Sequence, residues 1–151
     1  MKLAEALVLR ADIKKRLEQL KSRVIRNAKV QEGEAPAENP QALTEEMERI
    51  SNELTTLIQR INKTNNITEV SPGVTLADAI ATRDTLVLKH SFYRDLAQAA
   101  TITQDIRTKS EIKFKGTVSV PQVQAQADKL AQAHRSLDTQ IQETNWKTEL
   151  L

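Results

Sequence analysis

The sequence predicts a mainly α protein, an antiparallel bundle of about four long helices with a short β arm or ribbon between helices. Over most of the chain, apolar residues recur at alternating spacings of three and four, which is typical of an apolar helix face. Aromatic residues make up only 3% of the 151 residues and there are three glycines, so the core must be aliphatic. That composition favours packed helices over a sandwich or barrel.

The first two predicted helices cover residues 2–29 and 40–65. The seam of the first consists of Leu3, Ala6, Ile13, Leu17, Leu20 and Val24, interrupted by Arg10. The polar segment 31–40 contains one glycine and two prolines and is predicted to be a loop. Asn39 followed by Pro40 indicates a helix start. The Asn side chain can accept a hydrogen bond from a backbone N–H of the first helical turn, and Pro lacks only an N–H that would have no partner within the helix. Two helices joined in this way predict an antiparallel hairpin.

The third and fourth helices are predicted over residues 75–101 and 120–145. Thr75 and Asp78 fit a capping pattern after a turn at Ser71-Pro72-Gly73. Ser119 with Pro121 marks the start of the last helix. Together with the first two, these helices are expected to form a single helical domain spanning residues 1–151.

Two extended arms are predicted, over residues 67–74 and 111–119. In the second arm and on to residue 120, apolar and polar residues alternate as in a half-buried strand. One strand cannot satisfy its backbone alone, so the arms pair either within the chain or across subunits. An exposed apolar edge needs a cover, which favours a contact between subunits. The expected interface residues are Ile112, Phe114, Val118, Val120 and, as an aromatic anchor in the tail, Trp146.

The chain has no cysteine, which excludes disulfides, thiolate nucleophiles and cysteine-based zinc sites. Its uncharged runs are too short to cross a bilayer as helices, and the first residues do not resemble a signal peptide. The sequence therefore predicts a cytoplasmic protein.

No catalytic, cofactor-binding or metal-binding set is predicted. The Glu-x-x-His motif of di-metal bundles is absent, because Val87 and Ala131 stand three residues before His90 and His134. The two histidines are expected to form hydrogen bonds inside the core, the alternative being a metal site that recruits a further carboxylate. Arg10 and Arg83 lie at seam positions and should find carboxylate partners, the alternative being anion or substrate binding.

Basic residues dominate from Arg10 to Lys29, and acids collect between Glu32 and Glu53, although the net charge is only +2. The basic helix is expected to be solvated or to meet the acidic segment of its own or a neighbouring chain. The alternative is binding of nucleic acid.

Several stretches together, "MKLAEALVLRADIKKR", "NAKVQEGEAPAENP", "INKTN", "TLADAIATRD" and "NWKTELL", resemble a small bacterial family of uncharacterised proteins that often carries the name septicolysin. The resemblance implies a helical protein with a β arm that assembles as a homo-oligomer, in particular a hexamer. The family name suggests a pore-forming cytolysin, whereas a chain with no cysteine and one tryptophan lacks the marks of thiol-activated cytolysins. A non-enzymatic homo-oligomer is therefore the leading hypothesis, with pore formation and nucleic-acid binding as alternatives.

Overall fold

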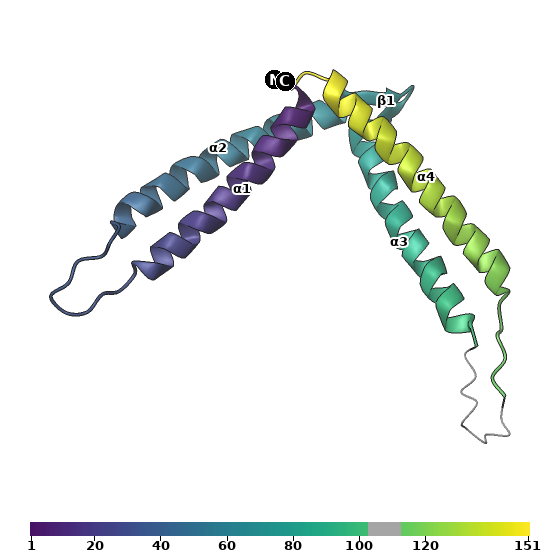
Figure 1. The fold of residues 1–151 in the computed structure, drawn as a ribbon. Coiled ribbons are helices and arrows are strands. Elements are labelled where there is room, and N and C mark those ends of the chain that lie inside the picture. Colours follow the sequence, from purple (N-terminus) through teal and green to yellow (C-terminus); the bar gives the residue numbers. More distant parts are fainter. Residues whose placement is uncertain (103–112) are drawn as a thin grey trace. The chain divides into compact units, whose positions relative to one another are not determined.

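The computed structural model describes residues 1–102 and 113–151, and this part of the chain contains four helices and one β-hairpin (Figure 1). In chain order the elements are α1 (Leu3–Arg26), α2 (Pro40–Ile67), β1 (Glu69–Ser71), β2 (Val74–Thr75), α3 (Leu76–Ala100) and α4 (Val120–Lys147). The predicted class, mainly α with four long helices and a short β ribbon between helices, is confirmed. The chain forms two compact units, Met1–Glu69 with Gln142–Leu151 and Val70–Ile141.

In the first unit, α1 and α2 form a helical hairpin (Figure 1). Leu20 of α1 is buried against Leu43 and Ile50 of α2. Partly buried residues of both helices surround this cluster: Ile13, Leu17, Val24 and Met47. The core is thus a narrow seam along one face of each helix, as the spacing of three and four requires.

The start of α2 is fixed by local side-chain chemistry. The Asn39 side-chain oxygen accepts hydrogen bonds from the backbone N–H groups of Gln41 (2.9 Å) and Ala42 (3.4 Å), and Pro40 occupies the first helical position. This is the start that the Asn-Pro pair predicts.

The predicted arm over residues 67–74 folds back on itself. β1 and β2 pair with each other, joined by Pro72 and Gly73. Gly73 has a φ of +76°, a left-handed conformation that a residue with a side chain rarely adopts. Proline followed by such a glycine favours a tight turn, and a short turn costs less chain entropy than a pairing with a segment 40 residues away.

The strand predicted over residues 111–120 is not formed in its described part. Ile112 lies outside the described residues, and residues 113–119, including Phe114 and Val118, belong to no strand. Val120 is helical, as the first residue of α4, where the N–H of Val123 donates to the carbonyl of Ser119 at 3.0 Å. The helix start encoded by Ser119 and Pro121 therefore overrides the alternation at its end.

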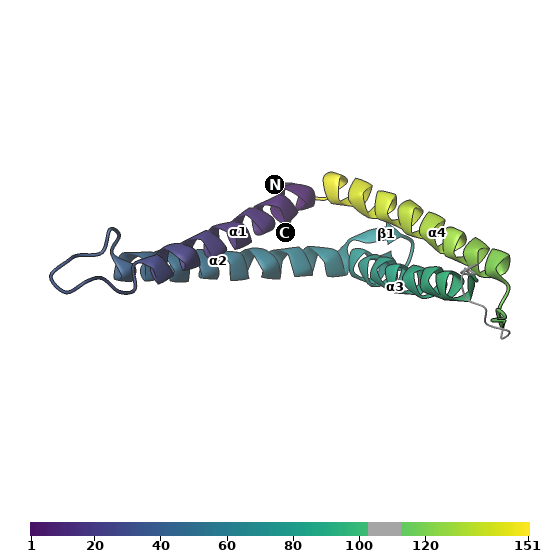
Figure 2. The ribbon, with the colours of Figure 1, turned by 60° about the horizontal axis from the view of Figure 1, so that its bottom comes forward.

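In the second unit, α3 and α4 run side by side in both views (Figure 2). The start of α3 is a reciprocal cap: the N–H of Asp78 donates to the Thr75 hydroxyl at 3.1 Å, and the N–H of Thr75 donates to the Asp78 carboxylate at 3.4 Å. The buried residues of this pair include three alanines, Ala79, Ala97 and Ala127. Leu76 and Ile141 are buried with them, whereas Val87, Leu88 and Phe92 of α3 remain exposed.

We expect Ile50→Ala to lower the free energy of unfolding by about 2–5 kcal/mol, because it leaves a cavity in the α1–α2 seam. Urea denaturation at a fixed protein concentration measures the loss. Ile25→Ala is the matched control, since Ile25 is exposed and should lose less than about 1 kcal/mol. Equal losses in the two variants would contradict the assigned seam.

Candidate functional site

Helix α3 carries large apolar side chains that remain exposed in the described part of the chain. Leu88 is 69% exposed and Phe92 65% exposed, and Val87 beside them is also exposed. We call Leu88, Phe92 and the half-buried Leu96 the outer face of α3, since they repeat at a spacing of four residues. A helix that is apolar on more than one side is usually buried on more than one side.

A groove of about 510 Å³ adjoins this face. It is lined by Leu88, Lys89, Phe92 and Tyr93 of α3 and by Gln126 and Leu130 of α4. The rings of Phe92 and Tyr93 meet edge to face with their centroids 5.4 Å apart. This aromatic pair is preorganised, because its geometry is one that aromatic rings prefer.

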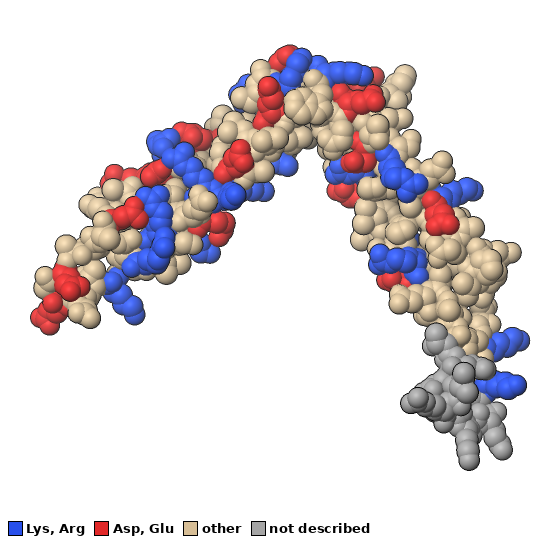
Figure 3. Space-filling model, viewed as in Figure 1, with Lys and Arg blue, Asp and Glu red and all other residues tan. Residues whose placement is uncertain are grey.

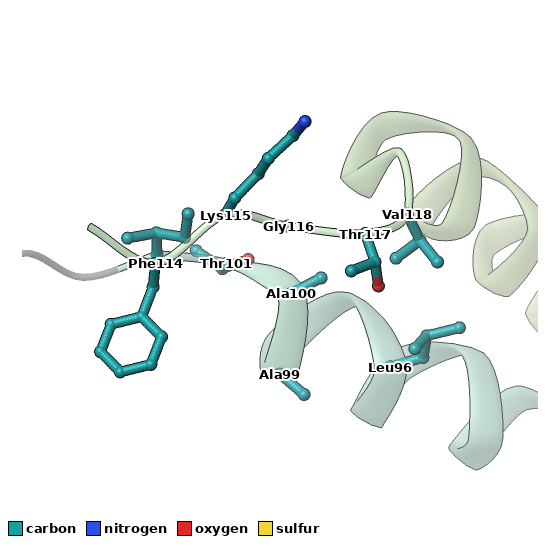
Figure 4. Close-up of a pocket in the computed structure, with 10 residues that line it drawn as sticks. Leu96, Ala99, Ala100, Thr101, Phe114, Lys115, Gly116, Thr117 and Val118 are labelled. Carbon is teal, nitrogen blue, oxygen red and sulfur yellow. The ribbon is translucent and has the colours of Figure 1, made fainter. Parts of the chain in front are cut away.

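The predicted arm residue Phe114 is 84% exposed, more than any other large apolar side chain of the described segments. Figure 4 shows its ring directed away from Leu96, at one end of a pocket of about 380 Å³ between the end of α3 and residues 114–118. A side chain at Gly116 would lie 3.3 Å from the carbonyl oxygen of Ala100, so glycine permits the close approach here. Val118 lines the same pocket and is exposed.

The other expected anchor, Trp146, lies in the last turn of α4 and is exposed. Its neighbour Asn145 is buried, and the Asn145 side-chain oxygen accepts no hydrogen bond from the described part of the chain. The last turn thus presents the tryptophan outward and the amide inward.

Of the four predicted interior polar residues, Arg83 has the expected carboxylate partners. Its guanidinium donates to Asp138 of α4 at 3.0 Å and to the adjacent Asp84 at 3.1 Å. Arg10, His90 and His134 are half-buried, and no ion pair to them is formed within residues 1–102 and 113–151. Across the same residues, no three His, Asp or Glu side chains gather closely enough to hold a metal ion.

The basic segment of α1 meets the acidic segment of its own chain at two places. Arg16 pairs with Glu46 at 2.6 Å, and the Nε of Arg23 donates to Glu38 at 3.1 Å. Figure 3 shows the resulting mixture of both charge signs over the α1–α2 unit. Asn27 adds to the second contact, because its side chain accepts from the backbone N–H of Glu38 at 3.1 Å. The hydrogen bond from Arg23 lowers the pKa of Glu38, and the same bond raises the pKa of Arg23.

An unpredicted site joins the two ends of the chain in what we call the terminal ribbon, residues 1–3 and 148–151. Lys2 and Glu149 form an antiparallel bridge: the N–H of Leu3 donates to Thr148, and that of Leu150 donates to Met1, both at 2.9 Å. The Glu149 carboxylate also binds the Lys2 ammonium at 2.6 Å and the amino group of Met1 at 3.1 Å. The hydrogen bond from Lys2 is the main cause of a lowered pKa of Glu149, and the hydrogen bond from the amino group of Met1 lowers this pKa further.

Helix α2 anchors the terminal ribbon. The buried hydroxyl of Thr64 accepts from the N–H of Leu151 at 3.1 Å, and the Nε of Arg60 donates to the main-chain oxygen of Leu151 at 2.6 Å. Sequence patterns could not reveal this site, because pairings two or three residues long have no periodicity. The opposite charges of Lys2 and Glu149 are the one feature of the sequence that could have indicated this pairing.

No helix in the described segments is long and apolar enough to cross a bilayer.

The terminal ribbon and the Arg23–Glu38 pair predict an acid-dependent loss of stability. A carboxyl group with a lowered pKa stabilises the fold above its ordinary value of 4.5, and this contribution disappears as the pH falls through the lowered value. The urea midpoint of the parent chain should therefore exceed those of Glu149→Gln and Glu38→Gln at pH 7. The differences should shrink as the pH falls below 4.5.

Glu48→Gln is the control for this titration, because Glu48 is exposed and forms no ion pair with the described residues. If Glu48→Gln lowered the urea midpoint with the same dependence on pH, the loss of stability would be due to the net charge of the protein and not to these two contacts.

The Arg83–Asp138 pair should contribute measurably to the packing of α3 on α4. A double-mutant cycle with Arg83→Met and Asp138→Asn is expected to give a coupling energy of about 0.5–1 kcal/mol, because the arginine is three-quarters buried. The cycle Arg94→Met with Asp95→Asn, an exposed pair within one helix, should give less. A coupling of zero for the first cycle would show that the contact is not maintained in solution.

Comparisons with known proteins agree with this architecture. The crystal structure of a functionally unknown conserved protein from Corynebacterium diphtheriae is similar at a TM-score of 0.94 and 44% sequence identity, over 100% of this chain and 99% of that chain. No match was found among curated proteins. Residues 10–150 match the model of a family of unknown function, DUF6847. The chain therefore belongs to the DUF6847 family.

Proposed function

We propose that the protein is a non-enzymatic helical subunit that assembles with copies of itself, and that the outer face of α3 forms a two-fold contact in that assembly. The observation that carries this proposal is the exposure of Leu88 and Phe92, at 69% and 65%, on a helix whose opposite side is already packed. Large apolar side chains grouped in this way mark an interaction surface.

The partner is a second copy of this chain, because the outer face of α3 is complementary to itself. When two α3 helices pack antiparallel about a two-fold axis at Phe92, residue i of one lies opposite residue 184 − i of the other. The two Phe92 rings then meet, and Leu88 of each copy faces Leu96 of the other. Lys89 and Asp95 lie on opposite flanks of this face, so the contact depends on its apolar centre and not on pairing between these charges.

The exposed Phe114, Val118 and Trp146 are proposed to form further contacts between copies, as expected from the sequence. A single two-fold contact gives only a dimer, so an assembly such as the implied hexamer requires at least one more surface. These residues supply further exposed apolar area.

The two alternatives remain predictions. Pore formation depended in part on a strand over residues 111–120, of which residues 113–119 form none here. Nucleic-acid binding depends on the basic first helix, where Arg16 and Arg23 are engaged by Glu46 and Glu38. Leakage of liposomes tests pore formation, and a salt titration on duplex DNA and single-stranded RNA tests nucleic-acid binding.

Light scattering with variants of the outer face of α3 tests the α3 contact. We expect a discrete oligomer larger than the 17.0 kDa subunit for the parent chain, and a smaller species for Phe92→Glu. Leu88→Lys should also give a smaller species, because it places a charge in the apolar centre of the contact.

Two controls separate the surfaces. Val8→Glu alters an exposed apolar residue of α1 and should leave the mass unchanged. Phe114→Glu with Val118→Lys, and separately Trp146→Ala, report on the additional contacts. A monomeric parent chain would contradict the proposal, and an oligomer unaffected by Phe92→Glu would remove α3 from the interface.

A further inference from the structure

A second groove, of about 640 Å³, lies between α1 and α2 in the first unit. Three arginines line it, Arg16, Arg49 and Arg60, and we call it the arginine groove. Its other lining residues are Met1, Leu9, Ile13, Asn52, Glu53, Thr56 and Leu57. The volume is within the range of about 300–1,000 Å³ that is typical of pockets for small molecules.

The lining of the arginine groove is positively charged. Glu53 is the one carboxylate among the lining residues and Glu46 binds Arg16 from outside the lining, so three guanidinium groups face two carboxylates. Anionic groups of a ligand would therefore be attracted to the groove.

The three arginines keep donors for a ligand. Arg16 uses one nitrogen to bind Glu46, Arg49 uses one to bind Glu53, and Arg60 uses its Nε to bind the main-chain oxygen of Leu151, each at 2.6 Å. A guanidinium has five N–H donors, so most donors of each group stay available to a carboxylate or phosphate. The two carboxylate pairs are more than half exposed on the arginine side, so exchanging them for a ligand costs little.

The rest of the lining includes apolar side chains. Leu57 is buried, Ile13 is half-buried, and Leu9 and Met1 remain exposed at the groove. A hydrocarbon chain lying on these side chains would cover apolar surface that water now contacts, at about 25 cal/mol per Å². The groove thus joins an apolar floor to a cationic rim.

We infer that the arginine groove binds a free single-chain anionic amphiphile, with a carboxylate or phosphate head on the arginines and its hydrocarbon chain along Leu9, Ile13 and Leu57. Charge complementarity selects the anionic head, and the apolar floor selects an attached chain over inorganic phosphate. All lining residues belong to the first unit, so the inference does not depend on the α3 contact.

The test is isothermal titration with dodecyl phosphate below its critical micelle concentration. Dodecyl maltoside supplies the same chain on a neutral head, and inorganic phosphate supplies the head without the chain. We expect saturable binding of dodecyl phosphate that weakens with added salt, and much weaker binding of the other two probes.

Matched variants localise the binding. Arg49→Gln should weaken it about tenfold, the effect of losing one charge-assisted hydrogen bond. Arg94→Gln is the control, because Arg94 has the same 57% exposure and a neighbouring carboxylate partner but lies on α3. Leu9→Asn should weaken binding, whereas Val8→Asn, at the adjacent exposed position of α1, should not.

Three results would overturn the inference. Equal binding of dodecyl maltoside would remove the role of the arginines, and equal losses in Arg49→Gln and Arg94→Gln would place the ligand elsewhere. Binding seen only with vesicles that contain phosphatidylglycerol would indicate a membrane surface as the partner instead of a free amphiphile.

Discussion

A pair of helices can bury only one stripe of each helix, and this constraint shapes every other feature of the molecule. In the first unit the stripe is narrow, with Leu20, Leu43 and Ile50 at its centre. In the second unit it includes Leu76 and Ile141 together with three alanines. Seams of this size bury little apolar area per residue, so polar ties within each unit add to the stability of the fold.

The polar ties of the first unit lie at the ends of its helices. Arg23, Asn27 and Glu38 connect the end of α1 to the loop before α2, and the terminal ribbon connects both chain ends to α2. Each bond contributes only modestly in an exposed position. In the terminal ribbon these bonds act together with the buried side chains of Leu3 and Leu150.

The sequence predicts the helices and their starts well, because those signals are local. Asn39 with Pro40 and Thr75 with Asp78 are caps whose partners lie within three residues, and the structure confirms both. Arg83 was correctly expected to find a carboxylate, but its partner Asp138 lies 55 positions away and no local pattern identifies it.

The failures come from features in which two patterns compete or no pattern exists. Residues 111–120 alternate like a strand, yet the helix start at Ser119 takes Val120, and the described residues 113–118 pair with no strand, since β1 pairs with β2. The exposure of Leu88 and Phe92 was not predicted, since apolar residues lie on more than one side of α3 and the spacing does not say which side is packed. The terminal ribbon involves too few residues to show a period.

The terminal ribbon also changes how the ends of the chain exchange their amide hydrogens. Ends usually fray, and their N–H groups exchange with solvent almost as fast as in an unfolded peptide. Here the amides of Leu3, Leu150 and Leu151 are all hydrogen-bonded, and Leu3 and Leu150 are also buried. Exchange at Leu3 and Leu150 therefore requires the two ends to separate, and exchange at Leu151 requires its release from Thr64, so deuterium uptake at the two ends would report the opening of the terminal ribbon.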